Sequence, residues 1–391
     1  MKTIYICATN RTPLGGFQGS FSSLTATDLG AESIKGTLNK AGISTSSIDE
    51  VYFGNVISAG LGQAPARQAA LKSGIDISTP CTTVSKVCGS GMKAIMLAAD
   101  NIQCGHSELV IAGGMESMSN APYLLNNARS GYRLGHNATK DSMFVDGLED
   151  AESGRLMGEF GQQVADKYAI SREQMDDYAI ESLQRAINAT DNDAFANEIS
   201  PVTMRTRKGE TVVEKDEQLA SAKPEKIRTL KPAFAKDGSV TAANSSSISD
   251  GAASMIVCAE EALSKNSISP EAKLVAQASH AQAPAEFTLA PIGAIRKVLA
   301  QTGWNKNDVD LFEINEAFAV VALLAMNDLD LDHKKVNIHG GACALGHPLG
   351  ASGARIIVTL IHALKRTGGK RGIASLCIGG GEATAVAIEL I

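Results

Sequence analysis

Apolar residues recur at intervals of three and four over Gly30–Lys40, which predicts an amphipathic helix. Apolar and polar residues then alternate over Ile48–Gly54, which predicts a strand with one buried face. The same succession returns as a helical pattern over Gly293–Gln301 and a strand pattern over Val309–Ile314. The glycines after the two helices (positions 42 and 303) and the starts of the two strands (48 and 309) are each 261 positions apart.

A second helix–strand pair repeats at nearly the same distance. Gly91–Ala98 opens a helix that leads to the strand pattern Leu109–Gly114, and the later counterparts are Gly353–Leu360 and Ile373–Ile378. The starts of these two helices are 262 positions apart, so four elements recur in one order at nearly one offset. We therefore expect two copies of one α/β unit, with mainly parallel strands covered by helices.

The stretch from 120 to 243 has no counterpart in the repeat and is richer in charge. Its clearest helical pattern is Asp166–Ala189, and the strand-like run Ala252–Ala259 returns to the apolar composition of the core. We interpret the stretch as a domain inserted into the first copy. The expected domains are residues 1–119 plus 244–268, the inserted domain 120–243, and the second copy 269–391.

Composition narrows the functional classes. The formal net charge of −6 gives no electrostatic basis for binding nucleic acid. No apolar run reaches the roughly 18 residues that cross a bilayer, and the first residues lack the apolar core of a signal peptide. The seven cysteines are odd in number and have no CxxC spacing, so we expect reduced thiols, a cytoplasmic protein and no metal site.

Cys88 lies between a strand-like run and the start of a predicted helix. The positive end of the helix dipole favours a thiolate there, and the small residues that follow leave room for a substrate and expose N–H donors. The alternative is a buried structural cysteine. His347 precedes another predicted helix, within a loop rich in Gly and Pro, where an imidazole can accept the proton of a nucleophile. The alternative for His347 is a structural loop histidine.

Two further side chains follow predicted strands. Cys377 is followed closely by Gly379–Gly381, where backbone can approach a ligand, so its thiol can act as an acid or base and the Gly379 N–H can bind an oxyanion. The alternative is a core cysteine. Asn315 precedes the apolar helical pattern Ala317–Met326, where Asn most often caps the helix, although its amide can also hold a water or polarise a carbonyl.

Together these segments resemble the catalytic motifs of the thiolase family, in the family's order and spacing, over essentially the whole chain. The resemblance implies the family's fold: a duplicated α/β core with two mixed β-sheets in αβαβα layers and an inserted loop domain. The matching segments are VCGSG around Cys88, NEAF from Asn315, GHP around His347, CIGGG from Cys377, the opening Arg11–Gly15 and the run Thr241–Asn244.

The resemblance also implies a role for each motif residue. Cys88 is similar to the nucleophile that carries the acyl group as a thioester, and His347 to its activating base. Asn315 is similar to the residue that holds an oxyanion-site water, and Cys377 to the second acid/base. The N–H groups of Cys88 and Gly379 are similar to a second oxyanion hole.

The coenzyme A positions of the family fall largely on the inserted domain and its edges. Lys226 and Arg228 supply positive charge for the phosphates of coenzyme A, and their alternative is a solvated charged face. The other positions that the resemblance assigns to coenzyme A are Leu148, Met157, Phe234, Ala242, Ser246, Phe287, Ala317 and Phe318.

Two positions depart from the family pattern. Leu156 stands where short-chain biosynthetic members have a histidine. Members that resemble the Phe287–Pro291 stretch bind potassium near the backbone of Ala242, Ala243 and Ser245, with help from a tyrosine whose position is Leu183 here. We therefore expect no resident cofactor and no metal ion.

The resemblance implies an acetyl-CoA C-acetyltransferase, which reversibly condenses two acetyl-CoA molecules into acetoacetyl-CoA and CoA. It also implies a homotetramer, with a tetramerisation loop near Asn120–Gly135. Three alternatives stay open: a 3-ketoacyl-CoA thiolase of fatty-acid oxidation with longer substrates, a decarboxylating condensing enzyme, and a non-catalytic acyl-CoA-binding protein. Cys377 and the Asn315 motif argue against the decarboxylating enzymes, and the presence of both Cys88 and His347 argues against a non-catalytic protein.

Overall fold

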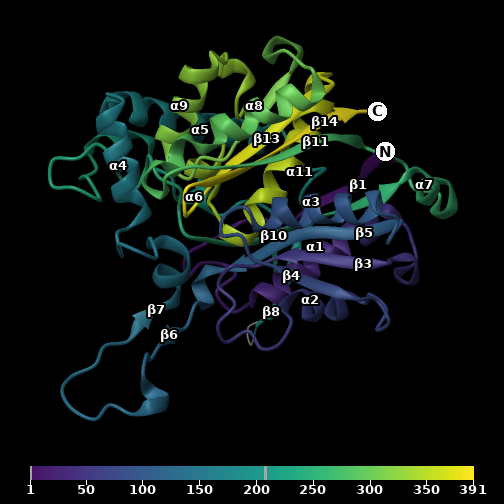
Figure 1. Cartoon of the computed structure of the whole chain (residues 1–391), viewed down its shortest axis with the longest axis horizontal. Coiled ribbons are helices and arrows are strands. Elements are labelled where there is room, and N and C mark those ends of the chain that lie inside the picture. Colours follow the sequence, from purple (N-terminus) through teal and green to yellow (C-terminus); the bar gives the residue numbers. More distant parts are fainter. Residues whose placement is uncertain (1, 207–208) are drawn as a thin grey trace.

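The computed structural model describes residues 2–206 and 209–391, which form a layered α/β structure around one large mixed sheet (Figure 1). The main path through the sheet runs β12-β13-β14-β11-β1-β10-β5-β3-β4, and β2 pairs with β10. Its strands are β1 (Ile4–Arg11), β2 (Gly15–Gly16), β3 (Glu50–Gly54), β4 (Cys81–Val84), β5 (Leu109–Ser117), β10 (Ser249–Ala259), β11 (Ala272–Ala281), β12 (Leu311–Ile314), β13 (Arg371–Ile378) and β14 (Glu382–Leu390).

The predicted duplication is confirmed by the strand pairing, but the expectation of mainly parallel strands is wrong, because most neighbouring strands of the sheet pair antiparallel. The first half has the order β1-β10-β5-β3-β4 and the second has β11-β14-β13-β12, with parallel pairing of β3 to β5 and of β12 to β13. A single parallel bridge from Phe312 to Val336 takes the place that β4 has beside β3. The two half-sheets join where Ile4–Ile6 of β1 pairs antiparallel with Ala272–Leu274 of β11.

Helices cover the outer faces and fill the space between the half-sheets. Figure 1 shows α3 and α11 between the half-sheets, and their apolar residues share one core with both. Helices α1 and α2 pack on the outer face of the first half, and α8 and α9 on that of the second. The helices of the two halves are α1 (Ala26–Ala41), α2 (Pro65–Ser73), α3 (Ser90–Gln103), α7 (Glu260–Asn266), α8 (Ala290–Thr302), α9 (Ala319–Leu329), α10 (Ala342–Leu345) and α11 (Leu349–Thr367).

Small residues let the two central helices approach each other closely. A Cβ atom on Gly91 would lie 2.8 Å from the carbonyl oxygen of Gly350, and one on Gly353 would lie 2.5 Å from the backbone nitrogen of Met92. Because real Cβ atoms do not come this close to backbone, glycine is needed on both helices. The crossing fixes the start of α3 beside the start of α11.

The segment between β5 and β10 carries elements of its own, two of which form an extended arm that projects from the body in Figure 1. The domain boundaries given above remain a prediction. The elements of this segment are β6 (Tyr123–Leu124) and β7 (Lys140–Asp141) in the arm, a π-helical turn (Phe144–Leu148), α4 (Met157–Lys167), α5 (Arg172–Asp191), β8 (Val202–Thr206), β9 (Gly209–Val213), α6 (Gln218–Ser221) and a 3₁₀ segment (Pro224–Thr229).

The single helix expected over Asp166–Ala189 is wrong, because the chain breaks between α4 and α5. Ala169 has a φ of +53°, a left-handed conformation that ends α4. Ser171 then caps α5, with its side chain accepting from the backbone of Gln174 and the Gln174 side chain accepting from the backbone of Ser171. Shorter 3₁₀ turns lie at Thr45–Ser47, Met118–Asn120, Ala128–Ser130, Pro284–Leu289, Lys306–Asp308 and His333–Lys335.

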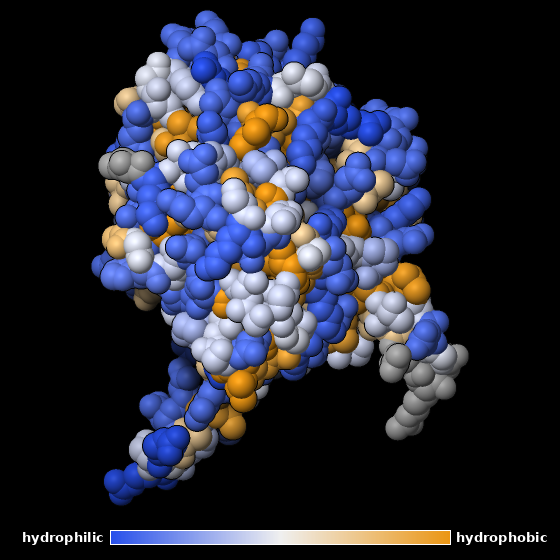
Figure 2. All heavy atoms as spheres, turned by 90° about the vertical axis from the view of Figure 1, so that its right-hand side faces the viewer, coloured by the Kyte–Doolittle hydropathy of each residue, from blue (hydrophilic) through white to orange (hydrophobic). Residues whose placement is uncertain are grey.

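The surface is mainly polar. Figure 2 shows a face dominated by hydrophilic residues, on which hydrophobic residues form small separate patches. In the ranges 2–206 and 209–391, helices that combine the length and the apolar character needed to cross a bilayer are absent.

Candidate active site

Cys88 lies in a tight turn between β4 and α3. Val87 has a φ of +44°, which turns the chain sharply just before the cysteine. The hydroxyl of Ser90 closes this turn: it accepts from the backbone N–H of Lys86 at 2.8 Å and donates to the carbonyl of Val87 at 2.7 Å. The turn therefore fixes the position of the sulfur, which lies on the wall of a cavity.

Burial raises the pKa of the Cys88 thiol to about 11. Hydrogen bonds from the backbone N–H groups of Gly379 and of Cys88 itself lower this pKa, and the charge of Glu116 raises it. At neutral pH the side chain is a thiol, so it needs a base before it can act as a nucleophile. The N–H groups that contact the sulfur are the two that the sequence assigned to an oxyanion hole.

His347 lies on the same cavity, one residue before the N-cap of α11. Its Nδ1 is 2.5 Å from the hydroxyl oxygen of Ser352, which itself donates to the carbonyl of Pro348 at 2.9 Å. Since the hydroxyl proton is used there, Nδ1 must be the donor, which assigns the lone pair to Nε2. Burial and then the charge of Arg355 lower the pKa of His347 to about 3, so the imidazole is neutral.

Asn315 connects this imidazole to a buried cation. Its Nδ2 lies 3.4 Å from His347 Nε2, and its Oδ1 accepts from Nη2 of Arg355, also at 3.4 Å. Asn315 is 1% exposed and follows β12 directly, so the strand end and the guanidinium hold its amide beside the imidazole. Sequence reasoning missed Ser352 and Arg355, although their spacing from His347 places both near one face of α11.

Cys377 is fully buried near the end of β13. Burial raises its pKa well above the ordinary value, and the charge of Cys88 raises it further, so the two sulfurs are electrostatic neighbours. Cys377 is not among the residues that line the cavity, whereas Gly379, two residues later, is. The structure therefore brings the second thiol close behind the wall on which Cys88 lies.

The cavity has a volume of about 380 Å³ and is lined largely by apolar side chains. Eight of the ten residues assigned to coenzyme A line it: Leu148, Met157, Phe234, Ala242, Ser246, Phe287, Ala317 and Phe318. Leu156 and Ser245, both noted above for other reasons, are also lining residues. The residues that sequence reasoning missed are Phe144, Gly147, Gly158, Ala233, Ser247, Ile248 and Leu349. Most of these lie close in sequence to a predicted residue, which is the signal that could have found them.

The other two residues assigned to coenzyme A lie away from this cavity. Lys226 and Arg228 are exposed residues of the 3₁₀ segment between α6 and β10. Arg228 forms an ion pair with Asp177 of α5, which offsets its charge. Their contact with phosphate remains a prediction.

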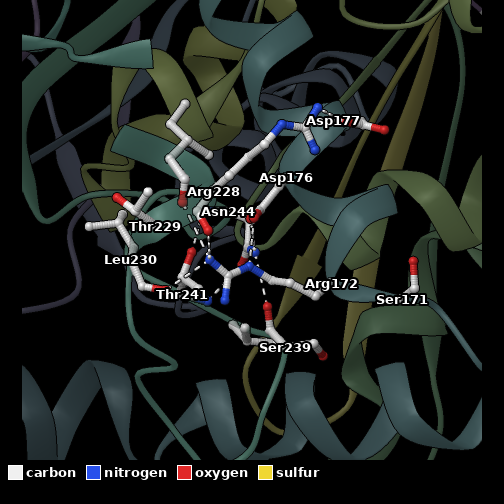
Figure 3. A network of polar contacts seen from close by, with 12 residues as sticks. Ser171, Arg172, Asp176, Asp177, Arg228, Thr229, Leu230, Ser239, Thr241 and Asn244 are labelled. Carbon is white, nitrogen blue, oxygen red and sulfur yellow. Dashed lines mark hydrogen bonds and ion pairs between the residues drawn. The ribbon is translucent and has the colours of Figure 1, made fainter. Parts of the chain in front are cut away.

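A polar network fixes the loop that forms one wall of the cavity (Figure 3). Asp176 of α5 accepts from Nε of Arg172 at 2.6 Å and from Nδ2 of Asn244 at 2.9 Å. Arg172 also donates to the carbonyl of Leu230, and Asn244 to that of Ser239. The side chain of Asp176 thus ties the cavity loop to α5, which gives Asn244, the last residue of the run Thr241–Asn244, a structural role.

The potassium position near Ala242, Ala243 and Ser245 also lies at this loop. The Ser245 hydroxyl donates to the carbonyl of Thr241 at 2.6 Å, which occupies one of the oxygens of the run. Across the described part of the chain, clusters of three or more His, Cys, Asp or Glu side chains that could hold a metal ion are absent.

Comparison with protein families gives matches over nearly the whole chain. Residues 4–261 match the thiolase N-terminal domain and residues 268–390 the thiolase C-terminal domain. Among curated relatives, acetyl-CoA acetyltransferase 1 of Arabidopsis thaliana is 48% identical over 393 residues, which cover 100% of this chain and 95% of the relative. The mitochondrial acetyl-CoA acetyltransferase of Rattus norvegicus is 47% identical, covering 100% of this chain and 91% of the relative.

Solved structures agree with this assignment. The Acat5 thiolase of Ascaris suum, in complex with coenzyme A, has a TM-score of 0.94 at 43% identity and is covered completely, as is this chain. The acetyl-CoA acetyltransferase of Bacillus anthracis has a TM-score of 0.97 at 40% identity, with 100% of this chain and 99% of that one covered. Human mitochondrial 3-ketoacyl-CoA thiolase has a TM-score of 0.96 at 38% identity, with the same coverage. The chain belongs to the thiolase family and is an acyltransferase.

Proposed function

We propose that this protein is an acetyl-CoA C-acetyltransferase that converts two acetyl-CoA molecules into acetoacetyl-CoA and CoA, and catalyses the reverse cleavage. The observation that carries the proposal is the shared cavity of Cys88, His347 and Gly379: a thiol, a neutral imidazole and an N–H donor on one apolar wall. Relatives named acetyl-CoA acetyltransferase and a relative crystallised with coenzyme A support the substrate class.

In the cleavage direction, His347 accepts the proton of Cys88, and the thiolate attacks the 3-keto carbon of acetoacetyl-CoA. The bond between C2 and C3 then breaks, which leaves an acetyl thioester on Cys88 and the enolate of acetyl-CoA. Cys377 gives its proton to C2 of this enolate, and acetyl-CoA leaves. The Cys377 thiolate then accepts the proton of the CoA thiol, and the CoA sulfur attacks the acetyl thioester. A second acetyl-CoA is released, and His347 returns its proton to the sulfur of Cys88.

The surroundings of the cysteines suit this sequence of steps. The backbone N–H groups of Gly379 and Cys88 are the donors that we assign to the tetrahedral oxyanion on the acylated sulfur, because hydrogen bonds from both lower the pKa of the thiol. Because burial keeps Cys377 protonated, its thiol is available as an acid in cleavage. In condensation, Cys377 first gives its proton to the CoA thiolate that leaves when Cys88 is acetylated, and the Cys377 thiolate then accepts the α-proton of the second acetyl-CoA. Thiol and imidazole suffice for each step, so we propose that the enzyme uses no resident cofactor, neither potassium nor another metal.

We further propose that the protein is a cytoplasmic homotetramer that acts in fatty-acid metabolism. The arm between β6 and β7 supports an assembly, because it projects from the body and exposes Tyr123, Leu125 and Leu134, the last at 98%. Free thiols at all seven cysteines are consistent with a reducing compartment. Sedimentation equilibrium of the full chain tests the tetramer, and a monomer at micromolar concentration would contradict it.

The nucleophile is tested by Cys88→Ser, with Cys104→Ser as the matched control because Cys104 is exposed and lies outside the cavity. We expect thiolysis of acetoacetyl-CoA to fall by at least about 10³-fold in the first variant and to stay unchanged in the second. When wild-type protein is incubated with acetyl-CoA and the reaction is then quenched, mass spectrometry should find an acetyl group on Cys88. Near-normal turnover by Cys88→Ser would reject the proposal.

Longer 3-ketoacyl-CoA substrates are the alternative within the family, and human mitochondrial 3-ketoacyl-CoA thiolase is a structural relative. A series of 3-ketoacyl-CoA thiolysis rates, with a 2-methyl branched member, decides between them. A kcat/KM that rises with chain length would favour the alternative.

A further inference from the structure

The oxyanion donor and the nucleophile come from different halves of the duplicated core. Cys88 lies in the turn before α3 of the first half, whereas Gly379 lies in the turn between β13 and β14 of the second. Gly379 and Cys88 line the same cavity, and a Cβ atom on Gly379 would lie 3.5 Å from the side chain of Val87, so the position of the Gly379 N–H beside the sulfur depends on how these two turns are aligned. A shift of about 1 Å between reacting groups is enough to slow an enzyme step by about 10²-fold.

Both turns are tight and meet through small contacts. Val87 has a φ of +44°, and Gly380 and Gly381 each have a φ of +88°. A Cβ atom on Gly89 would lie 2.3 Å from the side chain of Ile378, so the absence of a side chain at position 89 is what lets the turns touch. This van der Waals contact keeps the two turns from moving closer together, but it does little to keep them from moving apart.

One ion pair connects the two turns directly. Nζ of Lys86, two residues before Cys88, contacts the carboxylate of Glu382, three residues after Gly379. The side chains are 22% and 37% exposed, so the pair lies at the edge of the site, where water reaches it. Lys86 belongs to the turn that Ser90 closes, and Glu382 is the first residue of β14. The backbone of each charged residue is therefore held in place by hydrogen bonds.

We propose that Lys86 and Glu382 are positioning residues, which hold the Cys88 turn and the Gly379 turn in register so that the Gly379 N–H stays on the sulfur. This inference rests on the proposed acyl-enzyme function. An ion pair at this exposure favours the aligned turns over displaced ones by up to about fivefold in the equilibrium between them. Two like charges at the same positions favour the displaced turns by about the same factor.

The test uses the full chain with Lys86→Glu, Glu382→Lys and the double variant that exchanges the charges. We expect acetylation of Cys88 by acetoacetyl-CoA, measured by rapid quench, to slow about tenfold in each single variant and to return to within about threefold of wild type in the double variant. The thermal midpoint should change by less than about 3 °C, because a partly exposed pair adds little stability. Exchanging the charges of Arg296 and Asp328, an exposed pair between α8 and α9, is the control and should leave acetylation unchanged.

A second readout needs no substrate and separates alignment from a direct effect of charge. The pH profile of Cys88 alkylation by iodoacetamide reports the pKa of its thiol. If the pair aligns the turns, both single variants raise this pKa, because both weaken the Gly379 hydrogen bond. If the charges act directly on the sulfur, Lys86→Glu raises the pKa and Glu382→Lys lowers it, and that outcome overturns the proposal.

Single variants that acetylate and alkylate at wild-type rates, or a double variant as slow as the singles, also overturn it. Failure of the proposed function looks different. Wild type would then form no acetyl group on Cys88, while the alkylation profiles of the variants would still report whether the ion pair sets the environment of the sulfur.

Discussion

Arg11→Met should destabilise the protein strongly, because Arg11 forms ion pairs with both carboxylates of a buried cluster that attaches the segment between β5 and β10 to the core. The guanidinium is fully buried and forms two hydrogen bonds with Asp216, at 2.7 and 2.9 Å, and one with Glu198 at 2.5 Å. Both carboxylates come from the segment between β5 and β10, whereas Arg11 ends β1. Asp216 also accepts from the backbone N–H of Leu14 at 2.8 Å.

The expected magnitude follows from what the substitution leaves behind. Removing one partner of a buried ion pair costs about 3–5 kcal/mol, because the remaining charge stays desolvated without its counterion. Arg11→Met leaves two buried carboxylates close together, so we expect a loss near the upper end of this range. Methionine fills much of the side-chain volume, which keeps a cavity from contributing to the loss.

Urea denaturation of wild type and Arg11→Met measures the effect. A variant in which Glu198→Gln and Asp216→Asn accompany Arg11→Met should recover at least about 1 kcal/mol. A loss below about 1 kcal/mol for Arg11→Met alone, or no recovery in the triple variant, would refute the reasoning.

Two further predictions concern the imidazole. Because burial lowers the pKa of His347 to about 3, its unfolded form, with an ordinary pKa of 6.5, binds a proton first as the pH falls. The free energy of unfolding that this residue contributes is complete above pH 6.5 and is lost as the pH falls toward 3, by about 1.4 kcal/mol at pH 5.5. Urea titrations at several pH values measure this loss, and His347→Gln should lack it. Ser352→Ala removes the hydroxyl that accepts from Nδ1–H of His347 and so fixes its tautomer. The rate of Cys88 acetylation should therefore fall about tenfold, while the KM for CoA stays unchanged. An unchanged acetylation rate would reject the assigned tautomer.

The duplicated scaffold could be predicted from the sequence because its elements are long and strongly periodic. The start of α1 was placed four residues late, since Thr25 and Asp28 form the capping box before the apolar pattern begins. The break between α4 and α5 also had a signal, the pair Ser171 and Gln174, which matches the spacing of a capping box. The helical pattern of apolar residues continues on both sides of this pair, so the pattern alone gives no sign of the break.

The residues of the site could be predicted from the sequence, but not which of them line the cavity and which lie behind its wall. The motifs identified Cys88, His347 and Cys377 as one site, and no local pattern distinguishes a thiol on the cavity wall from one behind it. That difference depends on how β13 packs against its neighbours. The contacts of Ser352 and Arg355 depend in the same way on the rotation of α11 about its axis, which is set by its crossing with α3.

The duplication also explains why the chemistry is asymmetric. Asp49 accepts from the backbone N–H groups of Glu108 and Leu109 as Asp310 accepts from those of Lys370 and Arg371, so Gly54 occupies the position of Asn315, and Met115 the position of Cys377. Asn55 and Glu116 each follow these positions by one residue. Glu116 is fully buried and accepts from Nδ2 of Asn55 at 2.8 Å and from the backbone N–H of Gly350, at the start of α11, at 2.9 Å. The first copy thus uses its Asn and its strand-end side chain to hold the helix that follows His347. The second copy carries the amide of Asn315 and the thiol of Cys377 where the first carries glycine and methionine, so side chains of the first half hold in place the helix that follows His347 of the second.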